Sequence, residues 1–159
     1  MGTSSATSEA STTVSEELVD ELNRLLADYQ VLYQKLRAYH WNVEGKEFFQ
    51  LHEKFEELYD TVTLTVDDIA ERIRALGEYP VSTYSEQLVE ARISEDNGRI
   101  DSDQMVKNLC SDYESLQSAL TDAVDQAENE GDTTTVNLLE DVHDEQEETL
   151  WMLKAYLSE

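Results

Sequence analysis

Apolar residues recur at three- and four-residue steps through four long stretches of the chain, which is the period of an amphipathic α-helix. In the first stretch, Leu18, Leu22, Leu25 and Leu32 fall on one face. The chain has 5 Gly and only 1 Pro, so few residues interrupt these stretches, and long helices are favoured over many short strands. The pattern predicts long helices at about 15–41, 48–76, 103–129 and 133–157.

Capping signals indicate where these helices begin and end. Thr13 and Glu16 make a capping box, which predicts that the first helix begins near Thr13 or Ser15. Gly77 and Gly131 are the usual type of residue just past a helix end, and they follow the second and third helices. The first two helices are then joined by a short polar turn over residues 42–46.

A long connection over residues 80–102 separates the second and third long helices, and we expect a short helix within it at about 86–92. A connection of this length allows a crossover, in which the chain returns from one end of the bundle to the other. The predicted fold class is therefore all-α, a ferritin-like four-helix bundle with a short extra helix between helices 2 and 3. Residues 1–12 are rich in Ser and Thr and are predicted to be a flexible tail, followed by a single domain over 13–159.

The charge is strongly negative, with 36 Asp and Glu against 11 Lys and Arg, a formal net charge of -25. This balance argues against nucleic-acid binding, which needs a basic footprint, and the predicted tail contains no Lys or Arg. The strongly negative charge fits a protein that is adapted to high salt, or one that binds a cation. The single cysteine, Cys110, is expected in the core. The sequence shows no membrane-spanning or leader segment, so we expect a cytoplasmic protein.

Two of the three histidines, His40 and His52, flank the predicted turn between the first two helices and should lie at similar height. Three carboxylates follow on the second helix, Glu56 one turn beyond His52, and Asp67 and Glu71 one turn apart further along. A mixed set of imidazole and carboxylate ligands suits iron better than a metal that prefers thiolates.

The rise of a helix restricts how these groups are used. At about 1.5 Å per residue, His52 and Asp67 are about 22 Å apart, so one chain cannot close both around one ion. We hypothesise that the second helix packs antiparallel against its copy, so that the histidine end of one subunit faces Asp67 and Glu71 of another. Such a C₂ contact creates two equivalent sites per dimer.

Three segments with specific residue types and spacing resemble the signature of the Dps family of mini-ferritins. They are 40–45 (HWNVEG), 51–53 (LHE) and 67–72 (DDIAER). The closing segment 150–157 (LWMLKAYL) is similar to the last helix of several members. The resemblance is strong over the first two helices, whereas the middle connection matches only in its length and its short helix.

The resemblance implies a ferroxidase, an enzyme that oxidises Fe²⁺, with Trp41 packed beside its site. It also implies a dodecameric shell built from twofold dimers, hydrogen peroxide as oxidant, iron storage and protection against oxidative stress. Glu56 departs from the family, since many relatives carry Asp there. The ferroxidase ligands carried over by the resemblance are His40, His52, Glu56, Asp67 and Glu71.

Weaker candidates lie outside this set. Glu57 and Asp60 are close to the ligand face and are candidates for nucleating the ferric mineral. In relatives, acids at the start of the last helix line an ion pore; Asp132 is kept here, but Asn137 occupies a position where an acid is usual. Arg72 is expected to pair with a neighbouring acid.

Alternatives remain open at this point. Glu140 and His143 form one Glu-x-x-His element, which di-iron bundles use twice, so an intrasubunit ferritin-type centre is the second enzyme hypothesis. Otherwise His143 belongs to the apolar stripe of the last helix and bonds a neighbour, and Trp41 and Trp151 are packing residues. A non-catalytic shell that compacts DNA, or an acidic structural bundle with vestigial ligands, is the alternative to an enzyme.

Overall fold

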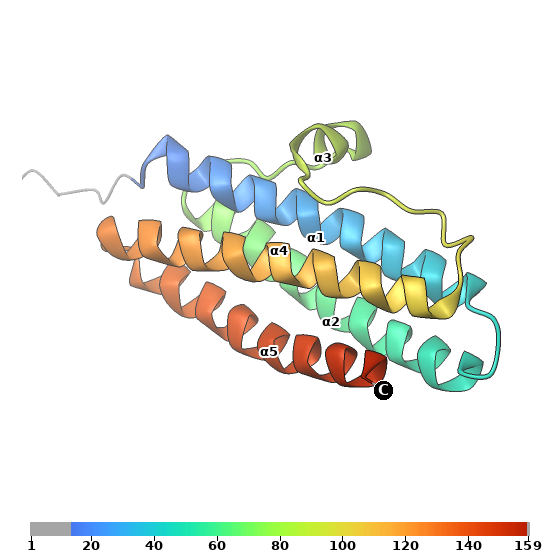
Figure 1. Ribbon diagram of the computed structural model, residues 1–159. Coiled ribbons are helices and arrows are strands. Elements are labelled where there is room, and N and C mark those ends of the chain that lie inside the picture. Colours follow the sequence, from blue (N-terminus) through green and yellow to red (C-terminus); the bar gives the residue numbers. More distant parts are fainter. Residues whose placement is uncertain (1–13, 159) are drawn as a thin grey trace, which may run out of the picture.

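The computed structural model describes residues 14–158, which form α-helices and no strand, as predicted (Figure 1). The predicted flexible tail, residues 1–12, lies outside the described residues. Among residues 14–158, no helix has both the length and the apolar character that crossing a membrane requires. The helices are α1 (Glu16–Asn42), α2 (Phe48–Ala75), α3 (Tyr84–Glu90), α4 (Ser102–Asn129) and α5 (Thr133–Leu157).

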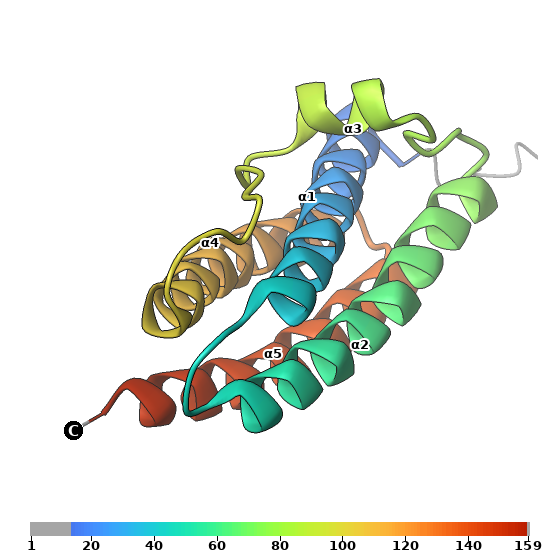
Figure 2. The same cartoon turned by 90° about the vertical axis from the view of Figure 1, so that its right-hand side faces the viewer.

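The four long helices form a bundle in which α1 lies beside α2 and α4, and α5 lies beside α4 and α2 (Figures 1 and 2). The turn between α1 and α2 makes this pair antiparallel. Helices α2 and α4 begin at the same end of the bundle, so the chain between them must return along its length, and it carries α3 across the outer side of α1 (Figure 1). The predicted ferritin-like bundle with a long crossover is confirmed.

The core consists of the apolar stripes that the sequence pattern indicated. Leu18, Leu22, Leu25 and Leu32 have no exposed surface, and burial of each such side chain stabilises the fold by about 1.5–3 kcal/mol. Cys110 is also buried, as expected. Because these stripes face inward, most charged residues of the same helices lie on the outside, and Asp28 and Lys35 of α1 are buried exceptions.

Local capping accounts for the differences from the predicted helix ends. The Ser15 side chain accepts a hydrogen bond from the Leu18 N–H, so Ser15 caps α1, while Thr13 of the predicted capping box lies outside the described residues. Thr83 caps α3 by accepting from the Glu86 N–H. Helix α3 therefore spans Tyr84–Glu90, two residues earlier than the predicted 86–92.

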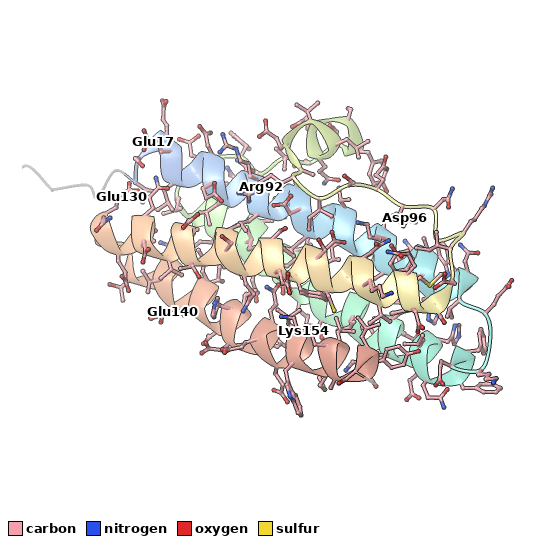
Figure 3. All side chains as sticks on the ribbon, in the orientation of Figure 1. Glu17, Arg92, Asp96, Glu130, Glu140 and Lys154 are labelled. Atoms are coloured by element: carbon pink, nitrogen blue, oxygen red, sulfur yellow. The ribbon has the colours of Figure 1, made fainter. Side chains whose placement is uncertain are left out.

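The crossover is fixed to α1 by a buried carboxylate. Asp28, 1% exposed, accepts hydrogen bonds from the backbone N–H groups of Arg92 and Ile93. The Arg92 side chain reaches α1 as well and forms ion pairs with Asp28 at 2.9 Å and with Glu21 at 2.8 Å (Figure 3). Because the backbone N–H of Arg92 bonds to Asp28 and not to a carbonyl of α3, the helix ends before Arg92.

The end of the crossover also packs tightly against α1. A Cβ on Gly98 would lie 2.9 Å from the backbone oxygen of Ala38, and the φ of +75° at this position suits glycine. Next to it, Asp96 accepts a 2.7 Å hydrogen bond from the Tyr39 hydroxyl (Figure 3). The crossover therefore supports the last turn of α1, immediately before His40.

Replacing Asp28 with Ala is expected to release the crossover. The change leaves two backbone N–H groups without an acceptor and removes one of the two ion pairs of Arg92. The free energy of local opening should therefore fall by about 3 kcal/mol, and amide exchange at Ile93 should accelerate about 100-fold. Hydrogen exchange followed by mass spectrometry measures this directly. The control, Glu21→Ala, removes only surface ion pairs, those with Arg92 and Arg24, and should change exchange by less than about fivefold. Equal effects of the two variants would contradict the assignment.

Candidate functional site

The turn between α1 and α2 brings His40 and His52 into contact. His40 lies in the last turn of α1 and is 9% exposed, and His52 lies in the second turn of α2. Their rings stack with centroids 3.7 Å apart and planes inclined by 13°. The sequence-based prediction that these two side chains lie at similar height is confirmed.

Each imidazole is oriented by the backbone of the other residue. The His40 Nδ1 lies 2.6 Å from the His52 carbonyl oxygen, and the His52 Nδ1 lies 2.7 Å from the His40 carbonyl oxygen. A carbonyl oxygen only accepts, so in each ring Nδ1 carries a proton, and the neutral tautomer that this bond selects has its lone pair on Nε2. This is the arrangement in which metal-binding histidines are usually held.

Aromatic side chains surround the pair. Tyr59 stands with its ring at right angles to His40, at a centroid distance of 5.5 Å, and Phe48 stacks on His52 at 4.9 Å. The Tyr59 hydroxyl donates a 3.4 Å hydrogen bond to Glu56. Partial burial and the negative charges of Glu56 and Asp60 raise the pKa of Tyr59, so its hydroxyl stays protonated and remains a donor.

Sequence reasoning missed Tyr59 and Phe48 as neighbours of the histidines. The available signal was spacing, because Phe48 lies one turn before His52 and Tyr59 lies two turns after it, on the same face of α2. The reciprocal histidine–carbonyl bonds carry no sequence signal, since they depend on how the turn sets the separation of the two helices.

Asp67 and Glu71 lie near the other end of α2, where both are exposed. The helix is continuous between the two groups, so the separation of about 22 Å from His52 to Asp67 stands. Within residues 14–158, the one group of three or more potential ligands that come together is His143, Asp144 and Glu147. The predicted ligand set therefore does not form a single site within one chain.

Arg72 pairs with Asp132, as expected for a neighbouring acid, at 2.8 Å. Asp132 is buried, caps α5 by accepting from the Thr135 N–H, and also accepts from the Thr135 hydroxyl. The sequence prediction assigned Asp132 to a pore and missed this structural role, which joins the end of α2 to the start of α5. Its place in a pore stays a prediction, as does the significance of the exposed Asn137.

Trp41 and Trp151 were expected to be packing residues, but within the chain they are 56% and 67% exposed. Trp41 carries the Arg37 guanidinium over its ring at 4.8 Å instead of packing into the core. The family resemblance implied that Trp41 packs beside the site, but it did not show that the side chain faces outward from its own chain. The mineral-nucleation candidates Glu57 and Asp60 are exposed, and Glu57 is paired with Lys54 at 3.3 Å.

Within residues 14–158, no group of three or more potential metal ligands comes together in the middle of the bundle, where the alternative, intrasubunit di-iron centre would lie. The hydroxyl of Tyr29 donates to Gln146 there, and the remaining cavity, lined also by Thr65 and Tyr113, measures about 20 Å³, room for one water molecule. His143 is not part of the apolar stripe, contrary to expectation. Its side chain is 32% exposed, lies beside Asp144, and is accompanied by an exposed Glu140.

Comparison with known proteins agrees with this architecture. The ferritin-like domain family matches residues 19–159. General stress protein 20U of Bacillus subtilis is 42% identical over 144 residues, which cover 91% of this chain and 99% of that protein. DNA protection during starvation protein 2 of Bacillus anthracis is 39% identical and is matched over 92% of this chain and 100% of its own length.

Solved structures show the same relationship. The crystal structure of the Dps protein from Vibrio cholerae O1, described as a member of a broad superfamily of ferritin-like diiron-carboxylate proteins, superposes with a TM-score of 0.89 at 42% identity and covers 92% of each chain. Dps from Staphylococcus aureus gives a TM-score of 0.89 at 37% identity, covering 91% of this chain and 97% of that one. This chain therefore belongs to the ferritin-like proteins and, among them, to the Dps mini-ferritins.

Proposed function

We propose that this protein oxidises Fe²⁺ with hydrogen peroxide at sites shared between two subunits and stores the ferric product inside a hollow shell. Membership of the Dps mini-ferritins supports iron storage and protection in general. The observation that carries the finer proposal is the contact between His40 at the end of α1 and His52 at the start of α2, in which a backbone carbonyl holds the Nδ1 of each ring. Helix α2 bears Asp67 and Glu71 at its other end.

The donor types suit both oxidation states of the substrate. Neutral imidazole nitrogens of His40 and His52 bind Fe²⁺, and carboxylates compensate the additional charge of Fe³⁺. In the proposed reaction two Fe²⁺ ions supply two electrons to one H₂O₂, whose O–O bond breaks, and two protons complete two molecules of water. Because both electrons come from iron within one site, no hydroxyl radical is released.

Glu56 is the proposed carboxylate nearest to the histidines. It lies one turn after His52 on α2 and is exposed, and its side chain accepts the hydrogen bond from Tyr59. That bond limits the freedom of a side chain that is one methylene longer than the Asp of many relatives. Tyr59 would therefore act as a positioning residue for the ligand.

Exposed apolar side chains support a partner subunit on this part of the molecule. Trp41 at the end of α1, and Phe49 and Leu64 on α2, are 56%, 80% and 67% exposed. Large exposed apolar groups mark surfaces that another protein covers. A second copy packed antiparallel along α2 would cover such groups while it brings its own Asp67 and Glu71 to His40 and His52.

Twofold dimers of this kind are the units of the dodecameric shell that we propose. With a net charge of -25 per chain, acids are available for the inner surface, where Glu57 and Asp60 are the proposed nucleation residues. Asp132 is the proposed pore acid. Its carboxylate already accepts from Arg72 and Thr135, so iron passage would rely on a group whose charge is largely compensated.

Asp67→Asn is expected to lower the initial rate of peroxide-driven Fe²⁺ oxidation by at least about 100-fold, because loss of a ligand should cost no less than loss of the groups that orient ligands. Stopped-flow absorbance of the ferric product measures the rate, and the wild type should oxidise two Fe²⁺ per H₂O₂. Asp68→Asn is the matched control, since it changes an adjacent exposed acid by the same charge, and it should retain the wild-type rate. Equal losses in both variants would remove Asp67 from the proposed site.

DNA binding is not expected, because the net charge of -25 repels a polyanion and residues 1–12 contain no Lys or Arg. In a gel-shift assay at low salt, where electrostatic attraction is strongest, the assembled protein should leave the mobility of duplex DNA unchanged. A retarded band that disappears as salt is raised would instead support the non-catalytic, DNA-compacting alternative.

A further inference from the structure

We propose that His143, Asp144 and Glu147 of α5 form a second binding site for a divalent transition-metal ion, separate from the centre proposed on α1 and α2. The ligand atoms of these three residues all lie within 4.8 Å of one another. The inference rests on α5 and its contacts alone, so it stands independently of the proposed ferroxidase activity.

The spacing of the three residues is that of a helical chelate. His143 and Glu147 are one turn apart and neighbours on the helix surface, and Asp144 adjoins His143, with its Oδ1 3.7 Å from the imidazole Nδ1. Ligands bound at about 2.1 Å to one ion are separated by at most about 4.2 Å, so small side-chain rotations complete the site. Asp144 is exposed and His143 half-buried, which leaves the remaining coordination positions to water.

A partly buried polar network holds this turn of α5 in place. Gln117 of α4 donates through Nε2 to the His143 carbonyl oxygen at 3.1 Å, and the Gln117 side chain in turn accepts from Gln146 at 2.9 Å. Gln146 is itself bound by the Tyr29 hydroxyl of α1. Because the backbone is anchored to two other helices, ion binding needs to order only the three side chains.

The charge around the site favours a cation. Residues 140–148 (EDVHDEQEE) contain six carboxylates, one histidine and no Lys or Arg. Asp144 has acids at the helical neighbour positions 140, 147 and 148, so like charges repel one another along this face. Lys154, further along α5, is paired with Glu114 at 2.9 Å. Figure 3 labels Glu140 and Lys154. A bound cation relieves this repulsion.

The donor set indicates the class of metal. One imidazole nitrogen with two carboxylate oxygens suits Zn²⁺ or Fe²⁺, whereas Mg²⁺ and Ca²⁺ prefer oxygen ligands alone. The histidine is what separates this cluster from the many exposed acids of the chain. The site would therefore bind Zn²⁺ or Fe²⁺ in exchange with solvent.

The test uses Zn²⁺ and the assembled protein in a His40→Gln/His52→Gln background. Glutamine can still donate to the facing carbonyl, and His143 is then the one histidine left in the sequence. Calorimetric titration should show about one Zn²⁺ per chain at this site, and His143→Ala or Glu147→Gln should weaken that binding at least about tenfold. Glu148→Gln, which removes an equal charge from the adjacent residue outside the cluster, should weaken it less than about threefold.

Two results would overturn the site. Zn²⁺ binding that is unaffected by His143→Ala, or that Glu148→Gln weakens as much as Glu147→Gln does, would show diffuse attraction to acids in place of a chelate. His143→Gln, which retains a polar side chain of similar length, guards against a folding defect in the Ala variant, and circular dichroism confirms that each variant is helical. In a crystal soaked with Zn²⁺, the anomalous peak should lie about 2.0–2.1 Å from an imidazole nitrogen of His143.

Discussion

The stiffness and length of α2 are the constraint on which the proposed site depends. One uninterrupted helix over Phe48–Ala75 carries His52 in its second turn and Glu71 in its last two turns, and no change of side-chain rotamer spans the distance between them. Helix α1 adds His40 to the histidine end only. A metal centre that uses all of these groups therefore requires a second α2, and the proposed oxidation of iron would depend on the association of two subunits.

Within one subunit, the rest of the fold serves to fix the histidine end. The bonds between each imidazole and the opposite backbone set the ring orientation, and they form only if the ends of α1 and α2 keep their spacing. The crossover supports that spacing from outside, because Gly98 and Asp96 contact the end of α1. Asp28, nearer to the start of α1, binds an earlier part of the crossover. The long connection is thus part of what positions the site, although it supplies none of the proposed ligands.

Periodicity was enough to predict the helices, because the leucine stripe of α1 and the glycines after α2 and α4 report burial and chain reversal directly. The proximity of His40 and His52 followed from the short turn. The outward position of Trp41 and the surface position of His143 could not be predicted, since each lies at the edge of a stripe where one helical step separates core from solvent. The structural role of Asp132 depends on Arg72, which is distant in sequence and meets it only in the packed bundle.

Shells assembled from two inactive subunits test the shared site most directly. One subunit carries His40→Gln and His52→Gln, and the other carries Asp67→Asn and Glu71→Gln, so neither alone offers a complete ligand set. In a random equal mixture, half of the dimers combine both types, and each of these has one of its two sites intact, which predicts about a quarter of the wild-type rate of Fe²⁺ oxidation. Mixed shells no more active than shells of either variant alone would contradict a centre built across two subunits.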